Sequence, residues 1–288
     1  MLSTDNVIID VKDVKFRYYG KKTFALNGIS LKIKKGEFLG ITGPNGAGKT
    51  TLSLCLDGLI PHIVEGKFYG DVIVDGMNTK EHSVSEMALK VGLVFQNPKA
   101  QLSGSALTVE EEVAFGVQNL GVPREELLKR VKEAIEIVGL SGLEQRSPFT
   151  LSGGQTQRLA IATVLAMRTK ILVMDEVTSQ LDPVGTFEVT KTTYKLHKEY
   201  GLTVVFISNK SELLAMLADR IVVMNQGEIV AIGSPKEIYN KIDFLEEIGV
   251  VPIPVTKLGK ILDERDNWGK PYPITDEEAI DFIKKHIS

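Results

Sequence analysis

The feature that most constrains this chain is the stretch "GPNGAGKT", Gly43 to Thr50, which fits the pattern G-x-x-x-x-G-K-[S/T]. It follows the apolar run "FLGIT" and precedes the helical run "TLSLCLDGL". Between a buried strand and a helix N-terminus, the glycines allow consecutive backbone N–H groups to surround phosphate oxygens. The alternative is an accidental glycine-rich turn, but the flanking strand and helix argue against it. The motif predicts a nucleoside triphosphate site.

Individual residues of this loop have distinct expected roles. Lys49 is expected to reach the β- and γ-phosphates, and the Thr50 hydroxyl is expected to hold Mg²⁺. The residues expected to contact the nucleotide here are Gly43, Pro44, Asn45, Gly46, Ala47, Gly48, Lys49, Thr50 and Thr51.

The stretch "ILVMDE" supplies two carboxylates at the end of a second apolar strand. Asp175 is expected to bind Mg²⁺, directly or through water, and Glu176 to polarise the attacking water. An acidic strand end that only caps a helix is the alternative. Beside a phosphate-binding loop, the pair favours hydrolysis of the triphosphate.

A further glycine pair, in "LSGGQTQRLA", opens another apolar helix. The N-terminus of that helix is a second site suited to an anion. One phosphate-binding loop already satisfies one face of a triphosphate, so the second site implies a separate role. Its residues are Ser152, Gly153, Gly154 and Gln155.

The three motifs together resemble those of the nucleotide-binding subunits of ABC transporters, and the resemblance extends over nearly the whole chain. The resemblance implies that ATP held by the phosphate loop of one protomer is covered by Ser152 to Gln155 of a second protomer. It also implies that Tyr18 stacks on adenine. Gln96, in "VFQNP", resembles the glutamine that contacts Mg²⁺ and the reaction centre, and "SQLDP" resembles the D-loop.

A narrower resemblance concerns the ATPases of energy-coupling factor importers, which take up vitamins or transition-metal ions. It is based on "GLIPHIVEGKFYGDVIVDG" and on the region from "QNPKAQL" to "GVP". It implies ATP and Mg²⁺ as cofactors and a homo- or heterodimer with another ABC ATPase. It further implies an integral transmembrane subunit, a substrate-binding membrane subunit and a location on the cytoplasmic face of the membrane. The membrane subunit selects the substrate, so the sequence does not identify it.

One position departs from the family pattern. The apolar run in "VVFISNK" predicts an interior parallel strand, and Asn209 follows it where the family has a histidine. Asparagine is shorter and carries no positive charge. We therefore hypothesise that this site binds ATP well and hydrolyses it poorly. Three explanations remain open: a different ATPase partner with its own histidine, a slow homodimer, or a replacement introduced to trap ATP.

These patterns predict an α/β fold. Residues 1–235 are expected to form the ATPase core, with an antiparallel region in the first third and a helical insertion at about 98–165. A short strand is expected from Gly70 to Gly76. Capping patterns at Ser83, Thr108 and Ser234 predict helix starts, as does Pro123. Residues 236–288 are expected to form a helical extension that joins two ATPases, as the resemblance implies.

Composition narrows the class of protein. The net charge of −3 argues against binding to nucleic acid through bulk charge. One cysteine, Cys55, excludes an internal disulfide, and we expect it to be a small core residue. His62 is expected to be structural. No apolar run is long enough to span a bilayer and no signal peptide is recognised, so we expect a cytoplasmic chain attached peripherally to the membrane.

Other functions share part of the pattern. ABC ATPases of translation or DNA repair usually contain two cassettes or a long coiled coil, and neither is visible here. A small-molecule kinase would share only the phosphate loop. A regulatory ATP-binding protein is the strongest rival because of Asn209. Co-purification with a multi-spanning membrane protein would separate a transporter subunit from these alternatives.

Overall fold

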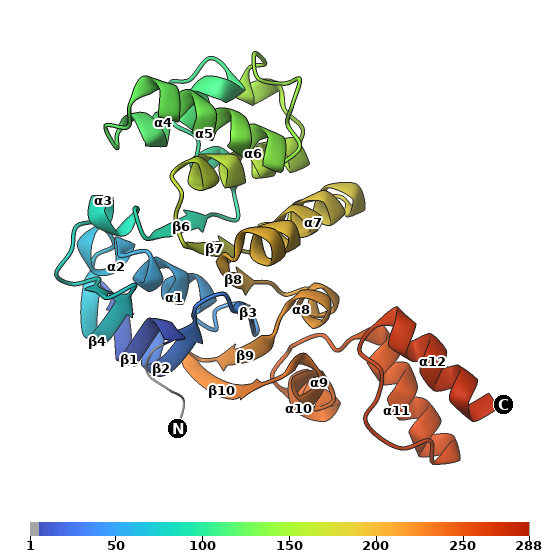
Figure 1. The fold of residues 1–288 in the computed structure, drawn as a ribbon. Coiled ribbons are helices and arrows are strands. Elements are labelled where there is room, and N and C mark those ends of the chain that lie inside the picture. Colours follow the sequence, from blue (N-terminus) through green and yellow to red (C-terminus); the bar gives the residue numbers. More distant parts are fainter. Residues whose placement is uncertain (1–5, 288) are drawn as a thin grey trace.

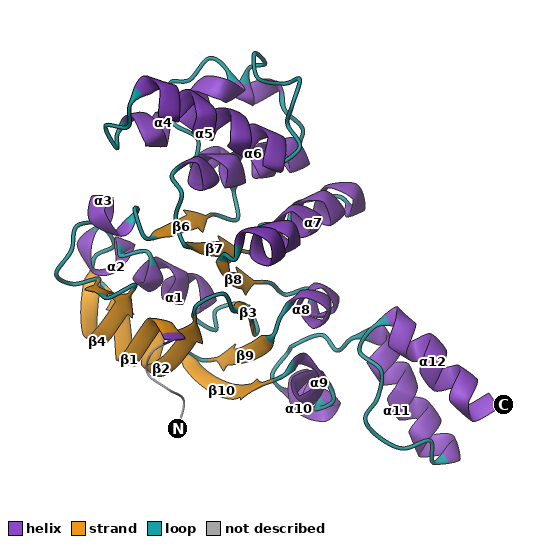
Figure 2. Ribbon diagram, in the orientation of Figure 1, coloured by secondary structure: helices purple, strands orange, loops and turns teal. Residues whose placement is uncertain are grey.

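The computed structural model describes residues 6–287 and contains two β-sheets (Figure 2). The smaller sheet is antiparallel, in the order β2-β1-β4-β5, which confirms the antiparallel region that we predicted. Strand β4 begins four residues earlier than expected, because its first part pairs with the end of β1. The strands of this sheet are β1 (Val7–Tyr18), β2 (Leu26–Lys34), β4 (Gly66–Val74) and β5 (Met77–Asn78).

The larger sheet has six strands in the order β10-β9-β3-β8-β7-β6. All neighbouring strands are parallel except β9 and β10, which pair antiparallel. Strand β8 lies in the interior, as predicted. The strands are β3 (Phe38–Thr42), β6 (Val91–Val94), β7 (Ile171–Asp175), β8 (Thr203–Ile207), β9 (Arg220–Asn225) and β10 (Glu228–Gly233).

The apolar run of β8 is explained by burial on both faces of the sheet. Val205 and Ile207 belong to one core, which also contains α1 (Lys49–Leu56) and the antiparallel sheet. Val204 and Phe206 belong to a second core, on the opposite face. Helices α7 (Pro183–Tyr200) and α8 (Ser211–Leu217) pack there, and Figure 1 shows α1 between the two sheets.

Three helices form a region that lies above the sheet in Figure 1, between β6 and β7 in sequence. They are α4 (Val109–Gln118), α5 (Arg124–Ile137) and α6 (Gly153–Ala166). The predicted cap at Thr108 is present, since its side chain accepts from the Glu111 N–H. Helix α5 is followed by Gly139, whose φ of +69° ends the helix, as glycine at this position commonly does. The short helices α2 (Leu59–His62) and α3 (Val84–Met87) lie beside the antiparallel sheet.

The chain ends in four helices, which confirms a helical C-terminal extension. Hydrogen bonds join distant parts of it: the Asn240 amide donates to the Tyr272 carbonyl, and the Thr256 hydroxyl to the Pro273 carbonyl (2.7 Å). The helices are α9 (Pro235–Tyr239), α10 (Ile242–Glu247), α11 (Pro254–Asp266) and α12 (Asp276–Ile287). The domain boundaries at 98, 165 and 235 stay predictions. Among residues 6–287, no helix is long and apolar enough to cross a membrane.

Candidate active site

The phosphate loop connects β3 to α1, and two of its glycines are required by close backbone contacts. A Cβ at Gly43 would lie 2.0 Å from the Met224 carbonyl oxygen, and one at Gly48 would lie 2.4 Å from that of Ala25. Both glycines also have positive φ, at +148° and +99°. No other residue fits these positions without moving the backbone, so the motif is fixed by packing of β9 and the Ala25 segment against the loop.

Lys49 is the first residue of α1, and its side chain is only 5% exposed. The ammonium group donates hydrogen bonds to the carbonyls of Gly43 (2.7 Å) and Pro44 (3.1 Å). Its nitrogen lies 3.6 Å from Oε1 of Glu176. Burial lowers the pKa of Lys49, and the Glu176 carboxylate opposes that shift. The loop therefore holds a buried cation between two of its own carbonyls and the Glu176 carboxylate.

Asp175 ends β7 and is 4% exposed. Its Oδ1 is buried and has no hydrogen-bond partner among residues 6–287. Burial raises the pKa of this carboxyl, and the hydroxyls of Thr50 and Ser53 act in the opposite direction. An orphaned carboxylate oxygen beside a hydroxyl is the oxygen-donor set that Mg²⁺ prefers. The residues therefore fit a magnesium ion held by Asp175 and Thr50.

One cavity of about 560 Å³ brings most of the predicted residues together. The Tyr18 and Thr51 hydroxyls are hydrogen-bonded to each other in its wall (3.0 Å). Ala25 also lines the cavity, and no motif predicts it, because it reaches the cavity through the pairing of β1 with β2. The lining residues are Tyr18, Ala25, Asn45, Gly46, Ala47, Gly48, Lys49, Thr50, Thr51, Gln96, Glu176 and Asn209.

Three polar side chains lie at the end of this cavity where the strands of the larger sheet finish. Gln96 follows β6 and donates from Nε2 to the hydroxyl of Ser179 (3.1 Å), within the predicted D-loop. Asn209 follows β8 and donates from Nδ2 to Oδ1 of Asn45 (3.3 Å). Glu176 follows β7 and has a φ of +49°. The cavity thus places a carboxylate and two amides beside the phosphate loop.

The signature residues are not part of this cavity. Ser152 caps α6 and forms a capping box with Gln155: its hydroxyl accepts from the Gln155 N–H, and the Gln155 side chain accepts from the Ser152 N–H. Ser152 and Gly153 are exposed, and none of Ser152, Gly153, Gly154 and Gln155 lines the cavity around Lys49. The folded chain therefore keeps its two predicted anion sites apart.

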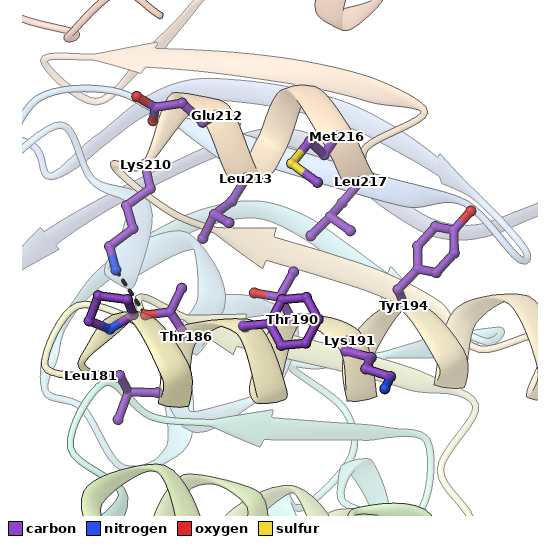
Figure 3. A pocket seen from close by; sticks show the side chains of 12 residues that line it. Leu181, Thr186, Thr190, Lys191, Tyr194, Lys210, Glu212, Leu213, Met216 and Leu217 are labelled. Atoms are coloured by element: carbon purple, nitrogen blue, oxygen red, sulfur yellow. Dashed lines mark hydrogen bonds between the residues drawn. The ribbon is translucent and has the colours of Figure 1, made fainter. Parts of the chain in front are cut away.

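A larger cavity of about 940 Å³ lies between α7 and α8 (Figure 3), but its chemistry does not suit a nucleotide. Its wall is formed mainly by apolar and aromatic groups such as Phe187, Tyr194 and Met216. The ammonium group of Lys210 is bonded to the Thr178 carbonyl (2.9 Å) and to the Thr186 hydroxyl (3.2 Å, dashed in Figure 3). The phosphate-loop cavity is therefore the candidate active site.

Cys55 and His62, which we expected to be structural, both lie outside the cavity around Lys49. Cys55 is fully buried in the core beneath α1, which confirms that it is a small core residue. The Nε2 atom of His62 lies 2.7 Å from the carbonyl oxygen of Thr79. This bond ties α2 to the segment that follows β5.

Comparisons with known proteins agree with this site. The family described as ABC transporter matches residues 26–179. An ABC transporter ATP-binding protein of Pyrococcus horikoshii is 47% identical over 277 residues, which cover 96% of each chain. The energy-coupling factor transporter ATP-binding protein EcfA of Methanocaldococcus jannaschii is 40% identical over 284 residues, covering 96% of this chain and 99% of that protein.

Solved structures show the same fold. CbiO1 of Clostridium perfringens, part of the ABC transporter complex CbiONQ, aligns with a TM-score of 0.74 and 30% identity. The alignment covers 90% of this chain and all of CbiO1. A dimeric ATP-binding cassette in a post-hydrolysis state, with ADP and Pi bound, aligns over 79% of this chain and 98% of its own, with a TM-score of 0.68 and 29% identity. The chain therefore belongs to the ABC transporter family, as one of its ATP-binding ATPase subunits.

Proposed function

We propose that this chain powers an importer of the energy-coupling factor type by hydrolysing ATP at the phosphate-loop cavity. The observation that carries the proposal is the convergence of Lys49, Thr50, Gln96, Glu176 and Asn209 on one cavity. Similarity to EcfA, an energy-coupling factor transporter ATP-binding protein, and to CbiO1, part of an ABC transporter complex, supports a transporter of this type. The resemblance of the sequence to importer ATPases implies a vitamin or a transition-metal ion as the substrate. In this role the chain binds peripherally to the cytoplasmic face of the membrane, on a transmembrane subunit that works with a substrate-binding subunit.

Each residue of the cavity has a definite task in phosphoryl transfer to water. Tyr18 stacks on adenine, and the N–H groups of residues 45–51 surround the phosphates. Lys49 binds the β- and γ-phosphates, which replace Glu176 as its anionic neighbour. Glu176 is then free to orient and polarise the attacking water. Mg²⁺, held by Asp175 and Thr50 with Gln96 near it, would neutralise phosphate charge.

The active unit is a dimer with a second ABC ATPase. Ser152, Gly153, Gly154 and Gln155 lie at an exposed helix N-terminus outside the chain's own cavity, where they are available to a nucleotide on another protomer. The dimeric cassette among the similar structures supports this arrangement. The C-terminal extension, α9 to α12, is the proposed element that joins the two protomers.

Asn209 sets the rate in this proposal. It lines the cavity with Glu176, but its amide is bonded to Asn45 and supplies no positive charge to the phosphate. Loss of a preorganised donor at a reacting group costs about 10²–10³ in rate. Binding is affected less, because Lys49 and the backbone N–H groups are intact. The site is therefore expected to bind ATP firmly and to turn it over slowly.

The test is steady-state hydrolysis by the wild-type chain and by Asn209→His, together with the ATP affinity of each. We expect the histidine variant to hydrolyse ATP faster, with an affinity within about threefold of wild type. Wild-type turnover equal to or above that of the variant would contradict the role of Asn209.

A regulatory ATP-binding protein is the second candidate, and the absence of a charge at Asn209 is the observation that favours it. Purification from the native membrane separates the two functions. A transporter subunit co-purifies with a multi-spanning membrane protein, and ATP turnover rises when that complex is intact. A regulatory protein would be recovered without such a partner, and its turnover would stay low.

A further inference from the structure

Residues 249–251 of the C-terminal extension lie in the segment that connects α10 to α11. These residues line a second, smaller cavity of about 180 Å³. The opposite wall of this cavity is formed by Thr42, Gly43, Pro44, Asn45 and Asn209. A segment about 200 positions later in the sequence therefore lies directly behind the loop that binds phosphate.

Asn45 and Asn209 are shared by the two cavities. Both residues line the 560 Å³ cavity of the active site and the 180 Å³ cavity beside the extension. A hydrogen bond of 3.3 Å from Asn209 to Asn45 joins these two exposed side chains. A shift of residues 249–251 would therefore change the support on one side of both amides, while their other side faces the nucleotide.

The segment is anchored two positions after Asn209. Ser211, the first residue of α8, donates from its hydroxyl to the Val251 carbonyl (2.7 Å). Only one residue separates Ser211 from Asn209. The Ser211 side chain is 2% exposed, whereas the Val251 side chain is 70% exposed. The contact therefore holds the backbone of the segment, and the exposed valine side chain contributes little.

Two further bonds fix the conformation of the segment. The Val250 N–H donates to the Leu245 carbonyl (2.8 Å), and the Val250 side chain is buried. The Gly249 N–H donates to the Glu246 carbonyl (3.0 Å), and Gly249 has a φ of +80°. A Cβ built on Gly249 would lie 3.8 Å from Cβ of Pro44, so the backbone here approaches the phosphate loop closely.

We propose that Ser211 is a positioning residue for ATP hydrolysis, acting through the Val251 carbonyl and residues 249–251 on Asn209 and Asn45. The extension thereby controls the geometry at the phosphate end of the site. This inference rests on the proposed assignment of the nucleotide to the phosphate-loop cavity. Because misplacement of a reacting group by about 1 Å reduces rates by up to about 10²-fold, a single anchoring bond can affect turnover measurably.

The test is a kinetic comparison of Ser211→Ala with a matched control, Thr256→Val. Thr256 also donates a buried hydroxyl bond of 2.7 Å to a backbone carbonyl, in the same extension, but its partner Pro273 does not line either cavity. We expect Ser211→Ala to lower kcat about tenfold while the affinity for a non-hydrolysable ATP analogue stays within about twofold. The control is expected to keep its kcat within about twofold of wild type.

A kcat of Ser211→Ala equal to wild type, or an equal loss in Thr256→Val, would overturn the inference. Failure of the proposed site itself has a different signature, because the wild-type chain would then bind the ATP analogue no better than Lys49→Ala does. Hydrogen exchange on the wild-type chain provides a second readout that does not depend on a variant. By linkage, the analogue should slow exchange of the Val250 and Val251 amides. No change at these amides would also overturn the inference.

Discussion

At the scale of single residues, the site contains two ionisable side chains, Lys49 and Asp175, whose charged forms are disfavoured by burial. Lys49 is 5% exposed and Asp175 4% exposed. Burial lowers the pKa of Lys49 and raises the pKa of Asp175, so each shift favours the uncharged form. Under the proposed function, these charges bind phosphate and Mg²⁺. The free protein is therefore destabilised at the positions that bind its ligands.

Asp175→Asn tests this cost directly. The pKa of Asp175 is raised in the folded state, so between the ordinary pKa and the folded pKa the folded protein holds a proton that the unfolded chain has released. This protonation favours the folded state, and its contribution to the free energy of unfolding is lost as pH rises through the folded pKa. An uncharged amide avoids that loss. We expect the variant to have a Tm about 2 °C or more above wild type near pH 8, with a smaller difference near pH 4, about the ordinary pKa of an aspartate.

The same variant should lose hydrolysis by about 10²-fold or more, since its amide cannot replace the carboxylate at Mg²⁺. Calorimetry at both pH values and a turnover assay measure the two effects. A variant that is less stable than wild type at both pH values would contradict the assignment of Asp175 as a charge held for its ligand.

Cys55 offers a probe of the core beneath the phosphate loop. Burial raises the pKa of its thiol, so little thiolate exists at neutral pH and the sulfur has no access to solvent. We expect no reaction with a chromogenic disulfide reagent in the folded protein and complete reaction of one thiol in guanidinium chloride. Labelling of the folded chain on the time scale of mixing would show that α1 opens readily, contrary to the packing of this core.

At the scale of elements, strand β6 and helix α6 approach each other so closely at Gly92 that a side chain there would clash with the helix. A Cβ at Gly92 would lie 1.9 Å from Cγ1 of Val164 and 3.1 Å from its Cβ. Gly92→Ala should therefore destabilise the fold by about 1–3 kcal/mol, as overpacking does. Adding Val164→Ala removes Cγ1 and should recover part of that loss, which denaturant unfolding would measure. Additive losses in the double variant would exclude this contact as the cause.

Local signals predicted the starts and ends of many elements well. The capping patterns at Ser83, Thr108 and Ser234 each form a capping box at a helix start. Helix α7 spans Pro183–Tyr200 as predicted, with Gly201 at its end. These signals depend on residues within one helical turn of each other, so they can be identified from the sequence alone. The order of strands and the start of β4 depend on pairing between distant segments, which no local pattern encodes.

The same division holds for the site. Motifs predict Lys49, Thr50 and Asp175 as site residues because phosphate and Mg²⁺ require those chemical groups at fixed spacings, and the structure places Lys49 and Thr50 in one cavity. The bond from Gln96 to Ser179 and the place of Ala25 could not be predicted, because both depend on how separate strands meet. The approach of residues 249–251 to the phosphate loop could not be predicted from the sequence either. It arises from packing of the extension, and no motif marks it.

At the scale of the whole molecule, the phosphate loop and the signature lie on different parts of one chain. The loop begins α1, between the two sheets, whereas the signature begins α6, in the helical region of Figure 1. Each is half of a binding site under the proposed function. A two-fold symmetric dimer would make both halves complete, because each protomer then gives its signature to its partner.

Mixing two inactive variants tests that arrangement. Lys49→Ala damages the phosphate loop and keeps the signature, whereas Ser152→Glu places a negative charge at the signature and keeps the loop. In a mixed dimer one site combines both defects and the other combines both intact halves. An equal mixture should therefore regain roughly a quarter of wild-type turnover, since half of the dimers are mixed and each has one intact site. The gain should follow a saturating dependence on protein concentration, because exchange of protomers creates it. If each chain completed its own site, the mixture would stay as inactive as its components. The baseline for that outcome is a mixture in which a chain carrying both substitutions replaces one of the two variants.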